Sequence, residues 1–393
     1  MVRAEPPGDS QADGEAVATG FEPRSLRLRV LSLVDVATDQ GGAERFAIAL
    51  ATHLPANRFE SWICATRSVE PQVIGTLRSA GVRHIALERR GKWDVLRLLR
   101  LVRLLRRERF DVLHAHKFGS NLWGTLIGRA CRVPVIIAHE HTWSYQGDPL
   151  RAWLDGRVIG RLATRFIAVS KADQERMVSV EHVPRGKIVV IPASVYISRP
   201  GSSGPDLRTE LGLASDTPLV VVVAVLRPQK ALSVLLEAML EIRNRGLDAH
   251  LVIAGDGACR EPLEQHTRDL GLQDAVHFLG RRSDIDAILR CADVAALSSD
   301  YEGTPVFIGE CVVNRVPVVS TAVGGIPEIL EDGRTALLVP PRDPTALATA
   351  IHRLLADPSE RERMASTAAT ELARLTIDAV AERVGRLYED LVG

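Results

Sequence analysis

The sequence predicts two α/β domains in tandem, each a doubly wound parallel sheet of the Rossmann-like type. Its 393 residues exceed the size of one ordinary hydrophobic core and fit two domains. Short apolar runs alternate with helical patterns, as in parallel sheets covered by helices on both faces. A stretch rich in Pro, Ser and Gly at 192–205 interrupts this alternation near the middle of the chain. Because such sheets bind ligands beyond the carboxyl ends of their strands, we expect a site in the cleft between the domains.

The first half of the chain contains apolar runs of strand length, at 28–34, 60–66, 83–86, 111–114, 134–138 and 165–169. Helical patterns stand between several of them, at 43–53, 74–79 and 93–109. A turn at Gly41-Gly42 separates the first strand from the first helix. These elements predict an N-terminal domain at 26–190, preceded by a disordered acidic tail at 1–25.

The alternation restarts after a linker at 191–205. Further strands are expected at 218–226, 250–254, 276–279, 294–297 and 316–320. Helices are expected at 231–243, 261–269, 284–291 and 305–314. These elements predict a C-terminal domain at 206–393, whose last helix can pack back on the first domain.

Composition places the protein among cytoplasmic proteins. The longest apolar run, 219–226, has eight residues, whereas a membrane-spanning helix needs about 20. The first two dozen residues lack the basic start and apolar middle of a signal peptide. The five cysteines are dispersed along the chain, without the spacing of a disulfide framework or a metal site.

Charge is distributed unevenly between the two halves. Residues 24–190 carry 28 Lys and Arg against 15 Asp and Glu, whereas residues 191–393 carry 20 against 29. The basic side chains gather in the helix expected at 93–109, at Arg97, Arg100, Arg103, Arg106, Arg107 and Arg109. This pattern fits a solvated helix face. It also fits a face that docks on anionic lipid, at the inner face of the membrane. Nucleic acid is excluded as a partner because aromatic residues, 4% of the chain, do not interleave with the basic ones.

The most informative stretch is 298–310, which follows an expected strand. Pro305 suits the first position of a helix, with Thr304 as its cap. The free N–H groups of that first turn would face the cleft and bind phosphate or sugar oxygens. Glu302 precedes the helix and Glu310 lies one and a half turns into it, so the two carboxylates can address opposite ends of one ligand.

This stretch resembles the paired-glutamate signature of the retaining GT-B glycosyltransferases of family four. The likeness extends to Pro317-Val318-Val319, Gly324-Gly325-Ile326-Pro327-Glu328, Asp332-Gly333 and Leu338-Val339-Pro340-Pro341. Upstream it includes 226–230, 253–257, Gly41-Gly42-Ala43-Glu44, 111–116 and Val169-Ser170. The resemblance therefore covers the chain from about residue 28 to the C-terminus, and its specificity lies in the order and spacing of the motifs.

The resemblance implies that a sugar moves from a nucleoside diphosphate sugar to an acceptor hydroxyl with retention of configuration. The N-terminal domain would bind the acceptor and the C-terminal domain the donor. Glu310 would hold the ribose and Glu302 would lie by the donor sugar, while Lys230 and Arg227 would bind the diphosphate without a metal or cofactor. The remaining donor-binding residues implied are Gly41, Gly42, Gly303, Thr304, Pro305 and Val306.

Two departures from the family pattern leave alternatives open. The family's Gly-Arg before the lysine is Ala224-Val225 here, and Arg227 is the nearest arginine. The loop after Ile191 also differs. The alternatives are a non-catalytic nucleotide-sugar binding protein and another GT-B enzyme, namely an inverting transferase, an epimerase or a phosphorylase. In an inverting enzyme, His141 or Glu44 could serve as the base.

Four histidines end two consecutive strands, His114 with His116 and His139 with His141. Spacing by two residues places each pair on one face of its strand, so a zinc site is conceivable. The family has a histidine beside the donor sugar, and His141 matches it best, which makes it the second candidate catalytic residue. The Asp284-Ile285-Asp286 sequence resembles a metal-binding DxD motif but is interpreted as the acidic first turn of a helix.

Overall fold

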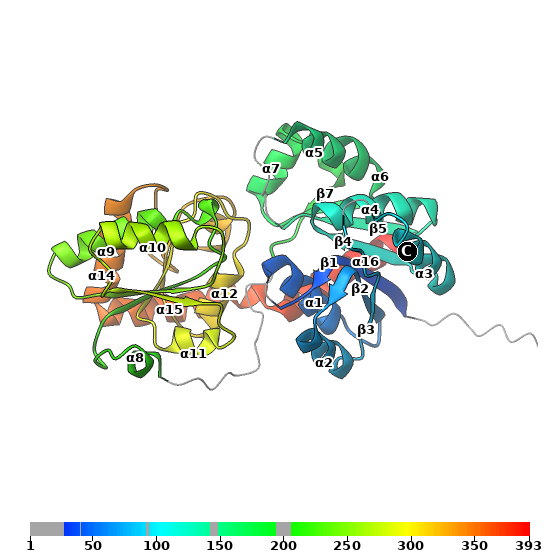
Figure 1. Ribbon diagram of the computed structural model, residues 1–393. Helices are drawn as coiled ribbons and strands as arrows, with labels where there is room; N and C mark the ends of the chain where they lie inside the picture. Colours follow the sequence, from blue (N-terminus) through cyan, green and yellow to red (C-terminus); the bar gives the residue numbers. More distant parts are fainter. Residues whose placement is uncertain (1–26, 40, 92–93, 142–147, 194–205) are drawn as a thin grey trace, which may run out of the picture.

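The computed structural model describes residues 27–39, 41–91, 94–141, 148–193 and 206–393. Its strands form two sheets, of seven strands in the order β3-β2-β1-β4-β5-β6-β7 and of six in the order β10-β9-β8-β11-β12-β13. Neighbouring strands of both sheets run parallel (Figure 1). The predicted fold of two Rossmann-like domains is therefore confirmed. The tail expected at 1–25 and residues 194–205 of the linker lie outside the described residues.

The strands of the N-terminal sheet are β1 (Leu28–Ala37), β2 (Phe59–Val69), β3 (Arg83–Ala86), β4 (Val112–His116), β5 (Val135–His139), β6 (Arg165–Ala168) and β7 (Ile188–Val190). Those of the C-terminal sheet are β8 (Leu219–Val223), β9 (His250–Ala254), β10 (Val276–Gly280), β11 (Val294–Leu297), β12 (Val318–Thr321) and β13 (Leu337–Val339).

The helices of the first domain are α1 (Gly42–His53), α2 (Pro71–Ser79), α3 (Leu98–Glu108), α4 (Lys117–Ala130), α5 (Pro149–Leu154), α6 (Gly160–Leu162) and α7 (Lys171–Ser179). Those that follow are α8 (Leu207–Glu210), α9 (Leu232–Asn244), α10 (Arg260–Asp269), α11 (Ile285–Arg290), α12 (Val306–Val313), α13 (Ile326–Ile329), α14 (Pro344–Ala356), α15 (Pro358–Glu371) and α16 (Ile377–Val392). No helix within the described ranges is both long and apolar enough to span a bilayer.

Alternation along the central strands builds a core on each face of both sheets. In β1, Leu31 and Leu33 pack on the side of α3 and α4, whereas Val30 packs on the side of α1 and α16. In β8, Val220 faces α9 and α14, and Val221 faces α11 and α12. Because successive side chains point to opposite faces, strands that are covered on both sides are mostly apolar on both faces.

The last helix, α16, returns to the N-terminal domain (Figure 1). Its residues Val380, Val384 and Tyr388 are buried against the side of the N-terminal sheet that α1 covers. Arg58 donates to Glu382 and Glu389 of this helix, which fixes its outer face. The chain therefore crosses between the two domains at two separate places.

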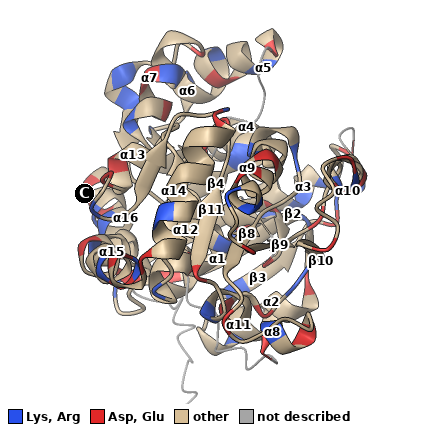
Figure 2. Ribbon diagram, turned by 90° about the vertical axis from the view of Figure 1, so that its left-hand side faces the viewer, with Lys and Arg blue, Asp and Glu red and all other residues tan. Residues whose placement is uncertain are grey.

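Helix α3 differs from the helix that the sequence predicted at 93–109 in its start and in its buried residues. The helix expected at 93–109 begins at Leu98, and its Trp93 lies outside the described residues. The inner face of α3 holds Leu98, Leu101, Leu104 and Leu105, while Val102 is only partly buried. In the C-terminal domain, acidic and basic residues are interspersed along α10 and α15 (Figure 2).

Candidate functional site

The loop between β11 and α12 carries the paired glutamates. The structure corrects one detail of its geometry, because α12 begins at Val306 and Pro305 is its N-cap, with extended backbone (φ −69°, ψ 124°). Thr304 does not cap the helix. Its hydroxyl donates instead to the carbonyl of Val169 in the other domain, over 3.0 Å. The unpaired N–H groups of α12 therefore start at Val306.

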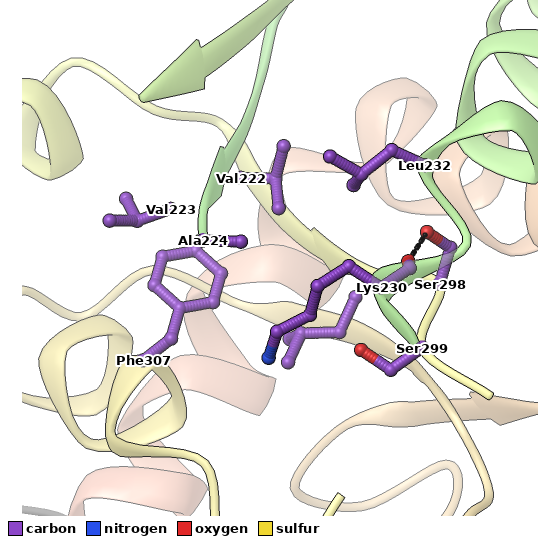
Figure 3. Close-up of a pocket in the computed structure, with 9 residues that line it drawn as sticks. Val222, Val223, Ala224, Lys230, Leu232, Ser298, Ser299 and Phe307 are labelled. Carbon is purple, nitrogen blue, oxygen red and sulfur yellow. Dashed lines mark hydrogen bonds between the residues drawn. The ribbon is translucent and has the colours of Figure 1, made fainter. Parts of the chain in front are cut away.

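Glu302 is buried next to Lys230, which lies in the loop between β8 and α9. Its Oε1 accepts hydrogen bonds from Lys230 Nζ at 2.5 Å and from Ser299 Oγ at 2.6 Å. Only 5% of Glu302 is exposed. In Figure 3 the Lys230 ammonium lies between the ring of Phe307 and the hydroxyl of Ser299. The small cavity around it is lined by Val222, Val223, Ala224, Lys230, Leu232, Leu297, Ser298, Ser299 and Phe307.

Glu310 is held by a cation from the opposite domain. Arg45 of α1 places Nη1 2.8 Å from Glu310 Oε1, and the side chains are 10% and 5% exposed. Nearby, a Cβ on Gly42 would lie 3.4 Å from Val306 Cγ2, so the first turns of α1 and α12 approach each other. Each glutamate of the pair thus has one basic partner, and together the two partners come from both domains.

Glycines allow the Glu302 loop to contact the N-terminal domain closely. A Cβ on Gly303 would lie 2.8 Å from the carbonyl oxygen of His141. Gly324 has a φ of +55°, and its Cβ would lie 1.7 Å from the carbonyl oxygen of Glu302. A Cβ on Gly325 would lie 2.7 Å from the Cβ of Ser170. Any other residue at these positions would push the loop away from its neighbours.

Glu328, the glutamate of the Gly-Gly-Ile-Pro-Glu run, has a role that the sequence did not predict. The carboxylate of Glu328 accepts from the backbone N–H groups of Lys171 and Ala172, at 2.9 and 3.0 Å, at the start of α7. An anion is favoured there because the first N–H groups of a helix lack partners. Tyr301 also donates to Asp173 of α7. The C-terminal domain therefore contacts α7 through the side chains of Glu328 and Tyr301.

The four histidines form two layers of imidazole rings at the carboxyl ends of β4 and β5. In one layer His114 Nε2 lies 3.1 Å from His139 Nδ1, and in the other His116 Nδ1 lies 3.0 Å from His141 Nε2. Rings stack between the layers, with centroids 4.2 Å apart along β4 and 4.1 Å apart along β5. Tyr388 of α16 completes the cluster, with its hydroxyl 2.6 Å from His114 Nδ1.

Burial keeps these histidines neutral. It lowers the pKa of His116 to about 3 and holds the pKa of His114 and His139 well below the usual range. The pKa of His141 is lowered by burial and then by His116, His114 and Lys117. His141 is therefore a neutral hydrogen-bonding group at the cleft.

A metal fits this cluster poorly. His114, His116 and His139 each offer a nitrogen, and these atoms lie within 4.8 Å of one another. However, ring nitrogens bind a metal in the plane of the ring, and stacked rings do not direct their lone pairs at one point. The nitrogen pairs at 3.1 and 3.0 Å are accounted for by N–H···N hydrogen bonds between neutral rings.

The remaining predicted donor-binding residues lie at the ends of two loops. Gly41 is the N-cap of α1, and its missing side chain leaves room for the carboxylate of Glu44, which pairs with Lys117 at 2.6 Å. Arg227 is exposed, on the turn that precedes Lys230. Val225 is 43% exposed. The structure thus brings Lys230, and not Arg227, against a signature glutamate.

Two facing Rossmann-like domains, with a paired-glutamate loop at their junction, define the GT-B class of glycosyltransferases. The signature of the glycosyl transferases group 1 matches residues 204–371, and that of glycosyltransferase family 4 matches residues 40–199. The chain therefore belongs to the glycosyltransferase family that these two signatures describe, group 1 or family 4.

Relatives and solved structures agree with this assignment. The alpha-D-kanosaminyltransferase of Streptomyces kanamyceticus is 30% identical over 76% of this chain and 82% of its own. A D-inositol 3-phosphate glycosyltransferase of Corynebacterium glutamicum is 27% identical over 90% and 93% of the two chains. The structure of Anabaena HepE in complex with UDP-glucose superposes with a TM-score of 0.80 at 20% identity, over 93% of this chain and all of that one. This last likeness concerns the fold.

Proposed function

We propose that this glycosyltransferase moves a sugar from a nucleoside diphosphate sugar to an acceptor hydroxyl and retains the anomeric configuration. The observation that carries the proposal is the pairing of Glu302 with Lys230 and of Glu310 with Arg45 around one loop and helix. The resemblance assigns these glutamates to the donor sugar and to the ribose.

The chemistry of the site suits these roles. Breaking the sugar–phosphate bond leaves negative charge on the diphosphate, and preorganised donors lower the barrier to that step. Lys230 and the first N–H groups of α12, beginning at Val306, are such donors. An ionised carboxylate accepts hydrogen bonds from two hydroxyls, as a ribose diol requires of Glu310. The neutral His141 offers one further hydrogen bond to the sugar.

Retention is supported because neither candidate base, His141 or Glu44, is available to take a proton from the acceptor hydroxyl. An inverting transferase needs a base near the acceptor hydroxyl. His141 is a weak base near neutral pH because burial lowers its pKa, and its Nε2 already contacts His116. Glu44 is paired with Lys117. We therefore favour a front-face substitution, in which the leaving phosphate takes the proton of the acceptor hydroxyl.

The anomer of the product tests this proposal. The protein would be incubated with UDP-, GDP- and ADP-glucose and a panel of hydroxyl acceptors, and the anomeric coupling of the product read by proton NMR. UDP-glucose comes first because HepE was solved with it. An α-linked product is expected from these α-linked donors. A β-linked product would sink the retaining mechanism, and donor binding without transfer or hydrolysis would favour a non-catalytic binding protein.

We also propose that the N-terminal domain contacts anionic membranes peripherally, on the cytoplasmic side. Three apolar side chains are exposed to solvent, Val95 at 47% and Leu96 at 76% just before α3, and Leu99 at 49% in its first turn. Arg103, Arg106 and the other exposed arginines of α3 follow them on the helix itself. An apolar edge beside basic side chains is the pattern of an interfacial helix.

Vesicle pelleting tests the membrane contact. Binding to vesicles with an anionic lipid should fall at high salt, because each basic side chain contributes about 1 kcal/mol near such a surface. Replacing Leu96 and Leu99 with Ser should weaken binding at low salt as well. Absent binding, or binding that salt does not change, would reject the contact.

A further inference from the structure

Arg45 reaches from the N-terminal domain to the ribose-binding glutamate proposed above. It lies in the first turn of α1, directly after the Gly41-Gly42 turn, and its Nη1 donates to Glu310 Oε1 over 2.8 Å. The two residues are 265 positions apart in the sequence. With side chains 10% and 5% exposed, the pair is largely shielded from water.

The other terminal nitrogen of Arg45, Nη2, indicates that this residue binds a ligand. Nη2 is buried and has no hydrogen-bond partner among the residues that the structure describes. A guanidinium presents its N–H groups as a fixed fork, so a contact through Nη1 leaves Nη2 with donors in a set direction. A buried donor without a partner is costly in a folded protein. An anion with several acceptor oxygens would remove that cost.

The surroundings of Arg45 favour an anion. The first turns of α1 and α12 meet here, as the 3.4 Å approach between a Gly42 Cβ and Val306 indicates (Figure 1). Neither helix has a side-chain cap, so both direct uncapped N–H groups toward this place. The nearby Glu44 is neutralised by Lys117. The two uncapped helix N-termini therefore add partial positive charge at the meeting point, beside the Arg45–Glu310 pair.

We propose that Arg45 is a donor-binding residue that holds Glu310 with Nη1 and a phosphate of the nucleoside diphosphate with Nη2. The proposal rests on the assignment of Glu310 to the ribose. Ribose and diphosphate are adjoining groups of one molecule, so a guanidinium bonded to the ribose-binding carboxylate is within reach of the first phosphate. Arginine suits such a place because its fork matches phosphate oxygens.

Arg45 also accounts for the missing arginine of the family pattern. The position before the phosphate-binding lysine is Val225 here, and this side chain is 43% exposed and apolar. Arg227, the nearest arginine in sequence, is exposed. A cation delivered by α1 replaces the absent charge from the opposite side of the cleft. Donor binding would then require both domains to be in place.

Binding of UDP and of uridine separates a phosphate contact from a structural role. Calorimetry on the full chain would give both affinities for the wild type and for Arg45→Gln. We expect the preference for UDP over uridine to fall at least tenfold in Arg45→Gln. If Arg45 only positions Glu310, both ligands lose affinity by the same factor and the preference is unchanged, which would overturn the proposal.

Three further proteins sharpen the result. Arg45→Lys keeps the charge without the fork and should recover only part of the preference for UDP. Adding Val225→Arg to Arg45→Gln should restore it, because this returns the arginine to its family position. Replacing Arg78, an exposed arginine of α2, with Gln is the control, and this variant should bind like the wild type.

If the wild type binds neither UDP, GDP nor ADP, the proposed function fails. If it binds UDP no more tightly than uridine, Arg45 is not a phosphate ligand.

Discussion

Lowering the pH from 7 to 5 should destabilise the N-terminal domain, because its four clustered histidines are neutral when folded. Burial lowers the pKa of each one, that of His116 to about 3. In the unfolded chain the same side chains take up a proton near pH 6.5. The unfolded state therefore binds more protons below that pH. The stability is fully present above about pH 6.5 and is lost as the pH falls below it.

The magnitude follows from the number of protons. Each histidine kept neutral reduces the free energy of unfolding by about 1.4 kcal/mol per pH unit below 6.5, so four reduce it by about 5–6 kcal/mol. Buried Glu140 acts in the opposite direction, because burial raises its pKa to about 8 and it loses a proton on unfolding. The raised pKa of Asp173 has the same sign. The net uptake of two to three protons corresponds to about 3–4 kcal/mol per pH unit.

Tryptophan fluorescence isolates this domain, since the five tryptophans all lie in the first half of the sequence, at Trp62, Trp93, Trp123, Trp143 and Trp153. Urea unfolding followed by this signal at pH 7, 6 and 5.5 gives the slope. Replacing His114 with Phe should lower it by about one proton, or about 1.4 kcal/mol per pH unit. Replacing the exposed His182 with Asn should leave it unchanged. A wild-type slope of less than one proton would refute a neutral cluster.

Three other outcomes are expected. Transferase activity should survive EDTA if, as proposed, Lys230 and the N-terminus of α12 bind the diphosphate in place of a metal; a loss reversed by manganese would contradict this. Gly128→Ala should destabilise the N-terminal domain by about 1–3 kcal/mol, since its Cβ would lie 2.8 Å from Leu113 Cδ2. Gly119→Ala, with nothing within 4 Å, is the control, and equal urea midpoints would disprove the clash. Tyr388→Phe should cost about 1–3 kcal/mol by leaving His114 Nδ1 unpaired, as thermal unfolding would reveal.

The sequence was sufficient for the architecture because the central strands are buried on both faces. A strand such as β8 must be apolar at every position, so its run of Leu and Val stands out from the helices around it. Strand β5 is also buried throughout, and it is apolar up to its last residue, His139. The Glu302 loop could be located for a related reason, since its two glutamates break an otherwise apolar segment between a strand and a helix.

Helix α4 was not predicted, and its sequence explains why. Its sheet-facing side carries Asn121, Thr125 and Gly128, not a stripe of large apolar residues. Asn121 exchanges hydrogen bonds with the backbone of His139, and Gly128 lets the helix approach β4 and β5 closely. A helix that is buried through polar contacts and small residues shows no strong period of 3.6 in hydrophobicity.

The contacts between the domains lay beyond any local pattern. Thr304 has the residue type of a helix cap, yet α12 begins one residue later than predicted, and the Thr304 hydroxyl donates to the carbonyl of Val169 in the other domain. In the sequence, Arg45 is only a basic residue of an amphipathic helix. Its ion pair with Glu310 forms because α12 packs against α1 in the folded protein. The partner of a side chain at the junction of two domains depends on how the domains pack, and a local sequence pattern carries no information on that packing. Sequence motifs can therefore name the glutamates of this site, but their basic partners follow only from the assembled fold.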